Sequence, residues 1–467
     1  MPGDGTNLST AWQGAVSNMR QQPAGEEDRG GTPVSAQDQV SVHYQSTPVP
    51  SKARRSVAIA SLGNILEWYD FVVYGFLVAY IAKNFFPATH ETAALLATFA
   101  AFGAGFVARP LGAVIFGRMA DVKGRRFVLL FAMFLMAGAS VLIGISPTYA
   151  TIGLAAPAII LLARLAQGLS AGAEFGGAAA YLIEWAPESK RGLFASFHQV
   201  GTYGGLLLGV ATVATISSVL TPAQMEEWGW RIPFLLGGLL AVVALYMRRN
   251  VEETPKFKNS HKGAAPQAAA SQGSSLFAAF QSVGVVALWS VTSFAVMVYM
   301  TTYTQRYGGL SAREALWSTS ISTMIGVFLI PVFGAISDRL GRRPVFGMGA
   351  GAFILLPIPF YGIIASAPGF QTIVLLQIVM SVFTAMIAGV GPAIISELFP
   401  TEQRATMVGI SSAIAVTVFG GFAPFISTIL IDKTGSSTAP AYYVVAIALF
   451  TTATVLSLRE TSRGRLQ

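Results

Sequence analysis

Long apolar runs separated by short polar loops fill the chain from about Ser56 to its end. Each run is roughly 20 residues long, the length that a helix rising about 1.5 Å per residue needs to cross about 30 Å of hydrocarbon. The pattern predicts twelve helices, which end near Phe86, Met119, Ser146, Glu184, Leu220, Arg248, Tyr307, Ser337, Ala365, Leu398, Ile431 and Leu458. We therefore expect an all-α membrane protein with twelve transmembrane helices.

Polar stretches divide this pattern into parts. Residues 1–55 are rich in Gly, Pro, Ser, Gln and Thr without apolar periodicity, which predicts a disordered cytoplasmic tail. The first apolar run begins too late for a signal peptide. A second polar stretch, 250–275, predicts a cytoplasmic linker, and 459–467 predicts a short cytoplasmic tail. Two six-helix bundles are therefore expected, at 56–249 and 276–458.

Two motifs occur twice. The spacing G-x-x-x-D-x-x-G-R-R is found at 117–126 and again at 334–343, which is 217 residues later. The spacing E-x-x-P-x-x-x-R is found at 184–191 and at 397–404, which is 213 residues later. Two motifs repeated in the same order at nearly the same offset indicate a duplicated unit. The two bundles should therefore be related by pseudo-symmetry.

Charge placement predicts the orientation. Only 11% of the residues are charged and the mean hydropathy is +0.59, whereas a soluble domain carries about 25% charge. The net charge is +8. Lys and Arg gather in the loops that share one side with both termini, which the positive-inside rule assigns to the cytoplasm. The basic excess thus indicates orientation in a lipid bilayer and not binding to nucleic acid.

Several kinds of chemistry are absent from the sequence. The chain has no cysteine, which excludes disulfides and thiol nucleophiles. Its four histidines are too dispersed to form a metal site with one another. We find no nucleotide-binding P-loop, no zinc-protease HExxH and no nucleophile elbow. We therefore expect no cofactor, no metal and no enzymatic activity.

The paired G-x-x-x-D-x-x-G-R-R loops resemble those of the major facilitator superfamily of secondary transporters. Within it, the stretches 63–71, 106–112, 164–176 and 228–234 resemble the metabolite:proton symporter family, whose members carry citrate, α-ketoglutarate, shikimate, or proline and betaine. The resemblance runs from about Ser56 to the C-terminus. It implies symport of a small metabolite with protons by a monomer in a bacterial inner membrane. Residues 409–443 read most like the citrate permeases, and 67–70 more like those for α-ketoglutarate and shikimate.

Ionisable side chains within the apolar runs are candidates for proton coupling, because each costs about 2.5–3.5 kcal/mol at mid-membrane. Glu67 and Asp70 share one face of the first helix, at a depth similar to that of Arg109 in the second. We expect a cluster in which an acid takes the proton and Arg109 holds an anionic substrate. The alternative is a permanent ion pair that joins the two helices. In the fourth helix, Glu174 is a further proton candidate or a satisfied interhelical carboxylate, and the resemblance links Arg164 to proton coupling.

Further polar side chains are candidates for the substrate site. His198 and Gln199 lie about two turns into the fifth helix. The histidine either relays a proton or binds a substrate carboxylate, or it is a packing residue held by hydrogen bonds. Tyr299, Tyr303 and Arg306 share a broad face of the seventh helix, which is either the second wall of the site or an aromatic interface belt. Two glycine stripes, which should let helices approach and slide during rocking, are Gly168, Gly172 and Gly176, and Gly201, Gly204, Gly205 and Gly209.

The repeated motifs predict a conformational latch. Their acids and arginines fall at the cytoplasmic ends of helices, where they can bridge neighbours while the inner side is shut and separate when it opens. The alternative, simple positive-inside anchoring, explains the arginines but not the acids. The predicted latch residues are Asp121, Arg125, Arg126, Glu184, Arg191, Asp338, Arg342, Arg343, Glu397 and Arg404.

These features together predict a proton-coupled symporter that imports a small organic anion by alternating access. A di- or tricarboxylate such as citrate or α-ketoglutarate is the expected substrate. An aromatic or cyclic acid of the shikimate or phthalate type, or a zwitterionic osmolyte such as proline or betaine, is the alternative. Export of an acidic drug, or a membrane sensor without transport, is less consistent with the pattern.

Overall fold

The computed structural model describes residues 51–123, 125–172, 182–183, 186–248 and 272–462. The predicted N-terminal tail up to residue 50, most of the predicted linker, Glu174 and Glu184 lie outside the described residues. So do the side chains of Asp121, Arg125 and Arg126, whose backbones are helical. Everything below concerns the described part of the chain.

The described residues are helical almost throughout. The first half comprises α2 (Ser51–Phe76), α3 (Val78–Phe85), α4 (Glu91–Lys123), α5 (Arg125–Ile145), α6 (Tyr149–Ile152), α7 (Ala155–Gly172), α9 (Arg191–Val219), α10 (Pro222–Glu227) and α11 (Ile232–Arg248). The second half comprises α13 (Gln272–Val291), a π-helical segment (Thr292–Val298), α14 (Tyr299–Arg306), α15 (Ala312–Leu340), α16 (Arg342–Leu355), α17 (Pro357–Ala365), α18 (Phe370–Glu397), α19 (Thr401–Ala415), a second π-helical segment (Val416–Gly421), α20 (Ala423–Thr434) and α21 (Ala439–Ser457).

The helices match the predicted twelve spans. Eight described spans are long and apolar enough to cross a membrane, two more are bent pairs, and Leu130–Ile145 and Gly229–Val242 are shorter apolar helices. The bends were not predicted: α2 and α3 meet at 62°, and α16 and α17 at 45°. Pro357 explains the second bend, because proline lacks a backbone N–H and clashes with the preceding turn. The first bend, at Leu77, has no proline near it that could explain it in the same way.

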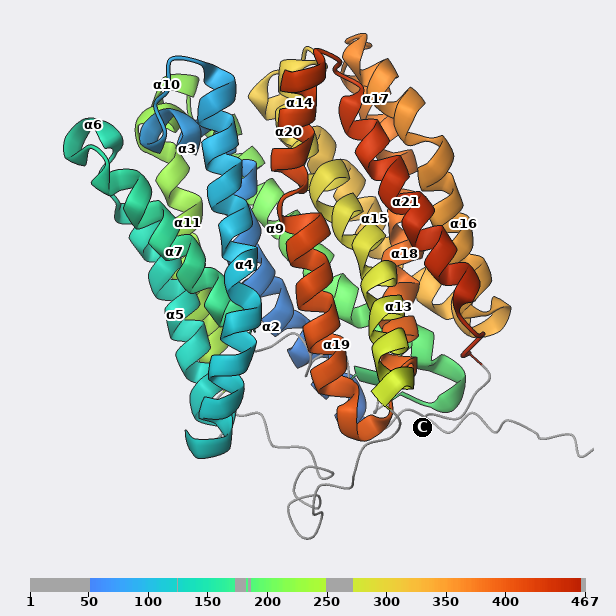
Figure 1. Ribbon diagram of the computed structural model, residues 1–467. Helices are drawn as coiled ribbons and strands as arrows, with labels where there is room; N and C mark the ends of the chain where they lie inside the picture. The colour runs from blue at the N-terminus through green and yellow to red at the C-terminus, as the bar shows by residue number, and fades with distance from the viewer. Residues whose placement is uncertain (1–50, 124, 173–181, 184–185, 249–271, 463–467) are drawn as a thin grey trace, which may run out of the picture. The chain divides into compact units, whose positions relative to one another are not determined.

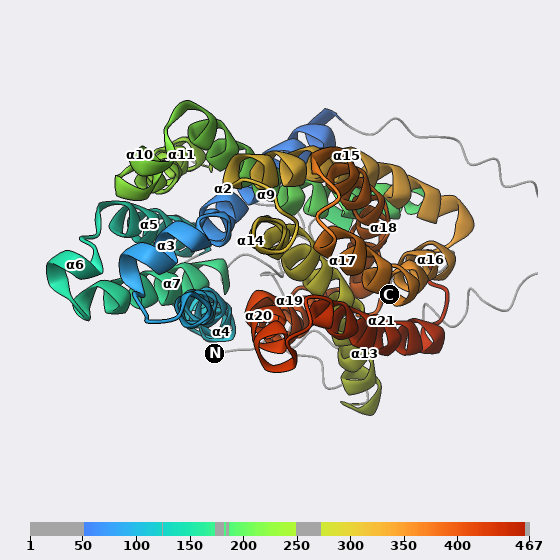
Figure 2. The ribbon, with the colours of Figure 1, turned by 90° about the horizontal axis from the view of Figure 1, so that it is seen from above.

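The two halves stand side by side in Figures 1 and 2, with blue to green helices in the first and yellow to red helices in the second. Helix α9 packs against α2 of its own half and against α15 and α18 of the other. Helix α4 packs against α7 of its own half and against α19, α20 and the π-helical segment between them. We call the contact of α9 with α15 and α18, and that of α4 with α19, α20 and the π-helical segment, the two seams between the halves. We call the end of the bundle that carries both repeated motif loops the motif end, and the opposite end the far end.

The described glycines of the two stripes lie inside the first half, whereas Gly176 lies outside the described residues. A Cβ atom at Gly168 or Gly172 would overlap backbone carbonyls of α4, and one at Gly205 would meet Trp68 of α2. The expected close approach of helices is thus confirmed at these glycines, between α7 and α4 and between α9 and α2. Sliding of these helices during rocking stays a prediction. Between the halves, the close backbone approach is made by Gly192 of α9 and Gly334 of α15, where a Cβ on Gly192 would lie 2.5 Å from the Gly334 carbonyl oxygen.

Candidate functional site

Arg109 of α4 lies in an aromatic box next to the seam. Its side chain is buried, and its guanidinium carbon lies 4.5 Å from the ring centre of Phe71, 4.8 Å from that of Phe106 and 5.0 Å from that of Trp68. Glu67 interacts with it electrostatically. Cation–π contacts of this kind contribute about 2 kcal/mol each when desolvated. Arg109 is thus a buried cation held by rings, with a carboxylate on the neighbouring helix.

The second half closes this box. Phe294, in the π-helical segment 292–298, has its ring centre 4.9 Å from that of Phe106 and 6.4 Å from that of Trp68. The Thr417 hydroxyl, in the other π-helical segment, donates to the Phe106 carbonyl at 2.9 Å. Single π turns inside α-helices often lie at functional sites. The three rings around Arg109 thus belong to the first half, and two of them pack against Phe294 of the second half.

Asp70 does not join the cluster predicted with Glu67 and Arg109. Its carboxylate is buried against α5 and α11, where Ser140 is its hydrogen-bonding neighbour and Gly237 leaves room for it. The spacing predicted that Glu67 and Asp70 share one face of the helix, but their carboxylates contact different neighbouring helices. It could not show that the turn between them directs one acid to α4 and the other into the interior of the first half.

Arg164 of α7 is fully buried and bonds to two neighbouring helices and to Gln167 of its own helix. Its Nη1 donates to the Phe71 carbonyl at 3.0 Å and to Gln167 Oε1 at 2.7 Å, and its Nη2 donates to the Phe102 carbonyl at 3.3 Å. Gln167 in turn donates to Ser140 Oγ at 2.9 Å. Sequence reasoning missed Gln167 and Ser140, although each is a polar residue inside an apolar run. Arg164 is therefore connected to Asp70 through two intermediate side chains.

Gln199 is the buried polar group most clearly short of partners at the α9 seam. It is fully buried, and neither its Oε1 nor its Nε2 has a hydrogen-bond partner among the described residues. One helical turn further on, the Tyr203 hydroxyl shares a 2.7 Å hydrogen bond with Ser293 Oγ of the second half. Leaving a buried amide unsatisfied costs about 1–3 kcal/mol per group. This position is therefore suited to a polar ligand or a water molecule.

His198, next to Gln199, is also buried, and its backbone carbonyl accepts from Asn64 Nδ2 at 2.8 Å. This hydrogen bond joins α9 to α2. The structure thus shows a packing contact made by the His198 backbone. A substrate contact made by its imidazole stays a prediction.

The predicted residues of the seventh helix separate into two groups. The Tyr303 hydroxyl donates to the carbonyls of Tyr361 and Ser437 at 3.1 and 3.0 Å, both within the second half. Tyr299 instead meets Phe99 of the first half, with ring centres 5.7 Å apart. Arg306 reaches α4 at the far end, where its Nη2 lies 3.3 Å from Thr92 Oγ1 and 3.8 Å from Glu91. Tyr303 therefore braces its own half, whereas Tyr299 and Arg306 contact the other.

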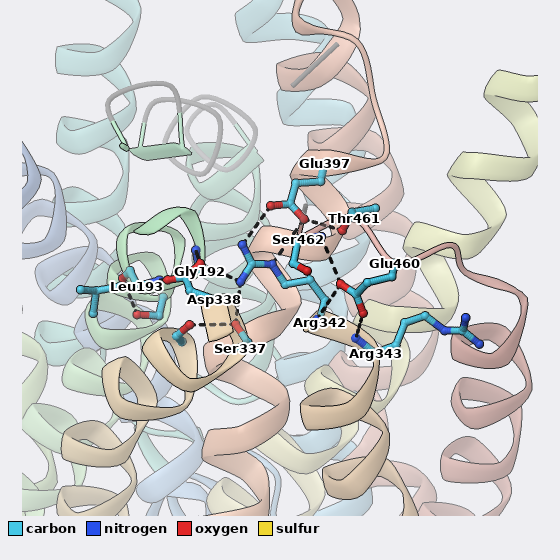
Figure 3. A network of polar contacts seen from close by, with 12 residues as sticks. Gly192, Leu193, Ser337, Asp338, Arg342, Arg343, Glu397, Glu460, Thr461 and Ser462 are labelled. Carbon is cyan, nitrogen blue, oxygen red and sulfur yellow. Dashed lines mark hydrogen bonds and ion pairs between the residues drawn. The ribbon is translucent and has the colours of Figure 1, made fainter. Parts of the chain in front are cut away.

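At the motif end, the second copy of the predicted latch forms a connected network (Figure 3). Asp338 accepts from the backbone N–H groups of Gly192 and Leu193 at 2.7 and 3.0 Å. Arg342 donates to Asp338 at 2.9 Å and to Glu397 at 3.1 Å. The N-terminus of a helix carries partial positive charge, so Asp338 is well placed at the start of α9. The network joins α15, α16 and α18 to the first half.

The segment after α21 adds to this network and was not predicted. Glu460 accepts from the backbone N–H groups of Arg342 and Arg343 at 2.8 and 3.1 Å, and Thr461 donates to Glu397 (Figure 3). Burial alone would raise the pKa of Glu460, but these N–H groups and that of Ser462 outweigh burial and lower it. An ionised Glu460 thus caps the N-terminus of α16. An acid directly after the last apolar run was the available signal in the sequence.

The structure gives one contact for each of three further predicted latch residues. Arg343 Nη2 donates to the Leu456 carbonyl at 3.0 Å, so it holds the end of α21. Arg191 is buried and lies 3.5 Å from Glu188. Arg404 is buried, and its Nε donates to the Ser396 carbonyl at 2.7 Å. Within the described residues, only the second-half copy of the latch can be followed from side chain to side chain. No group of three or more candidate metal ligands is found there either.

The apolar helices in two repeated sets, with buried charges at the seams, define a multi-pass membrane protein of the transporter type. Residues 56–276 match the model of the family "Sugar (and other) transporter", and residues 290–466 match that of the "Major Facilitator Superfamily". The chain belongs to the major facilitator superfamily. The resemblance drawn from the motif loops is thereby confirmed.

The similar proteins are named for different substrates. The chain is 36% identical over 388 residues to a citrate-proton symporter of Klebsiella pneumoniae (83% of this chain, 87% of the relative). It is 36% identical over 410 residues to an alpha-ketoglutarate permease of Escherichia coli K12 (87% and 93%). It is also 34% identical over 435 residues to a proline/betaine transporter of Salmonella typhimurium (89% and 85%). The relatives are thus transporters of small organic solutes.

Solved structures share the fold. A D-xylose-proton symporter superposes with a TM-score of 0.70 at 19% identity, covering 88% of this chain and 99% of that one. The xylose transporter XylE from E. coli, in a partially occluded inward-open conformation, gives a TM-score of 0.68 at 21% identity, covering 89% and 99%. The predicted fold class, all-α with twelve helices of the major facilitator type, is confirmed.

Proposed function

We propose that this protein is a proton-coupled symporter that imports a small organic anion, a di- or tricarboxylate such as citrate or α-ketoglutarate. It acts by alternating access as a monomer in a bacterial inner membrane, with both termini in the cytoplasm, and needs no cofactor or metal. The observation that carries the proposal is the buried Arg109, boxed by rings of the first half that pack against Phe294 of the second, and accompanied by Glu67. The citrate and α-ketoglutarate relatives support the same substrate class.

The substrate carboxylate pairs with Arg109, since a guanidinium binds a carboxylate through two parallel hydrogen bonds. Glu67 competes for the same cation while the site is empty, and the Gln199 amide supplies a neutral donor and acceptor from α9. Entry of each proton gains about 2.3 kcal/mol per 100 mV of membrane potential. Protons taken up with the anion therefore offset its electrostatic repulsion by the negative cell interior.

Alternating access needs contacts between the halves that form on one side and break on the other. At the motif end, the Asp338 contact with Gly192 and Leu193 serves this purpose. At the far end, Arg306 with Glu91 and Thr92 is the corresponding contact. We propose that Asp121, with Arg125 and Arg126, acts for the first half as Asp338 does for the second.

Uptake into proteoliposomes tests the proposal. Labelled citrate, α-ketoglutarate, shikimate and proline are offered with and without an inward proton gradient. We expect gradient-dependent uptake of a di- or tricarboxylate, reduced at least a hundredfold by Arg109→Gln. Arg118→Gln, which neutralises an exposed arginine on the same helix, is the matched control and should transport normally. Saturable binding without uptake would instead indicate a sensor.

The second candidate substrate is a zwitterionic osmolyte. Proline/betaine transporters are as similar to this chain as the carboxylate symporters, at 34% identity over 435 residues in one case. Gradient-dependent uptake of proline in the same assay, without uptake of the acids, would select this alternative.

A further inference from the structure

We propose that Ser140 of α5 and Gln167 of α7 are positioning residues for proton coupling: they connect the carboxylate of Asp70 to the guanidinium of Arg164. This inference rests on the proposed function, because it assigns a role within the proton-coupled step. None of the four side chains lies in the aromatic box around Arg109. The argument starts from the direction of their hydrogen bonds.

The hydrogen bonds run in one direction. Arg164 Nη1 donates to Gln167 Oε1 at 2.7 Å, and Gln167 Nε2 donates to Ser140 Oγ at 2.9 Å. Because Ser140 Oγ accepts this bond, its own O–H is available to donate, and its hydrogen-bonding neighbour is the carboxylate of Asp70. The Nε2 group of Gln167 also approaches the Asp70 backbone carbonyl at 3.4 Å. The series thus begins at a permanent cation and ends at an ionisable acid.

Such a series is polarised, and each bond strengthens the next in a medium of low dielectric constant. Ser140, Gln167 and Arg164 are all fully buried. An ionised Asp70 completes the series as its final acceptor. A protonated Asp70 carries no charge to orient it, so the bonds back to Arg164 weaken. The protonation state of Asp70 is therefore transmitted to Arg164 without direct contact between them.

One oxygen of Asp70 is left open for the proton. Asp70 is 5% exposed, and its Oδ1 has no hydrogen-bond partner among the described residues. It lies against Gly237 of α11, where a Cβ atom would overlap it. A buried carboxylate oxygen without a donor is costly, and protonation lowers that cost by removing the negative charge. Gly237 and Ser140 thus place one oxygen for the proton and the other for the series.

Few other charged groups face Asp70. On its own helix, the Tyr69 hydroxyl is next to it and donates to the Pro233 carbonyl at 2.8 Å, while Glu67 interacts with Arg109. From α7 the facing charge is Arg164, through Gln167. From α5 and α11, the described contacts are those of Ser140 and Gly237, which are uncharged. Arg164 is therefore the cation that responds to Asp70.

The ring of Phe71 connects this series to the substrate site. The guanidinium carbon of Arg164 lies 4.2 Å from its centre, and that of Arg109 lies 4.5 Å from the same centre. Arg164 also holds the carbonyls of Phe71 and Phe102, which belong to the two helices that form the box. If the hydrogen bond between Arg164 and Gln167 weakens, Arg164 can shift against the Phe71 ring, and that ring also contacts Arg109.

Transport assays that separate proton coupling from binding test this inference. Entrance counterflow exchanges substrate without net proton movement, whereas gradient-driven uptake requires it. We expect the counterflow rates of Ser140→Ala and Gln167→Leu to stay within about twofold of wild type. Their rates of gradient-driven uptake should fall at least tenfold. Ser140→Thr keeps the hydroxyl and should restore coupling. Ser366→Ala, at an exposed serine, is the matched control. Equal losses in both assays, or none, would overturn the positioning role.

A second measurement does not depend on transport. Infrared difference spectra of the purified protein between acidic and alkaline pH should show a carboxyl band that Asp70→Asn removes. We expect Ser140→Ala to shift the frequency of this band, because a hydrogen bond to the carboxyl group is lost. An unshifted band, or none assignable to Asp70, would overturn the inference. Absence of transport by the wild type, together with a shifted band, would count against the proposed function alone.

Discussion

The carboxylate of Asp338, near the end of α15, accepts a hydrogen bond from the backbone N–H of Gly192 at 2.7 Å, across the seam between the two halves. The acceptor comes from a repeated motif of the second half, and the donor is in the first turn of a helix of the first half. A carboxylate at a helix N-terminus is stabilised both by the N–H groups and by the helix dipole. The contact joins the two halves at the motif end.

Asp338→Asn should favour opening at the motif end. Hydrogen bonds to charged groups contribute about 1.5–3 kcal/mol each, and about 1.4 kcal/mol changes an equilibrium tenfold. We therefore expect the open state to gain roughly tenfold in population. Because the chain has no cysteine, Ser196→Cys at this seam provides a single thiol, and its labelling by a membrane-permeant maleimide should accelerate several-fold. Asp432→Asn, at an exposed aspartate of the far end, should not change the rate.

Arg342→Lys should destabilise the protein, although it conserves the charge. The Arg342 side chain is 2% exposed and bridges Asp338 and Glu397, which a lysine ammonium cannot do with the same planar geometry. Leaving one partner of a buried ion pair uncompensated costs about 3–5 kcal/mol, so a clear fall in the thermal unfolding midpoint is expected. Arg339→Lys, at an exposed neighbour, is the control. Equal midpoints for the two variants would show that the bridge contributes nothing to stability.

Gly192→Ala should prevent closure at the motif end. The added Cβ atom would lie 2.5 Å from the Gly334 carbonyl oxygen and 2.6 Å from Ser337 Oγ. We expect normal insertion, at least tenfold slower uptake, and the same accelerated labelling of Ser196→Cys as with Asp338→Asn. Gly347→Ala adds the same atom where nothing lies within 4 Å and should behave as wild type. Wild-type uptake by Gly192→Ala would contradict the close approach.

Glu460→Gln should lower stability at neutral pH but not at low pH. The pKa of Glu460 is lowered in the folded protein by the backbone N–H groups that it accepts from. Its contribution is therefore fully present above its ordinary pKa and is lost as the pH falls through the lowered value. Because Glu460 is exposed, the effect should be small, about 0.5 kcal/mol. Unfolding midpoints of the two proteins should differ at pH 7 and converge near pH 3; a difference independent of pH would exclude this cause.

Much of the candidate site could not be predicted from the sequence. The spacing of Glu67 and Asp70 predicted one shared face, whereas in the structure the two carboxylates contact different helices. Between lipid-exposed and buried faces of an apolar helix, hydrophobicity discriminates poorly, because lipid is as apolar as a protein core. Gln167, Ser140 and Phe294 therefore gave no signal stronger than that of many other residues in the same runs. Their role depends on the crossing of helices that are distant in sequence.

The sequence by itself determined the twelve apolar helices, their two repeated sets and the acids at the motif end, because membrane thickness imposes a length on each run and duplication preserves spacing. Only the tertiary structure decided that Asp70 turns away from Arg109 towards Ser140, that Phe294 closes the box from the other half, and that Glu460 caps α16. These contacts depend on helix rotation, on bends such as that at Leu77 and on packing between the halves. Local periodicity contains no information on any of the three.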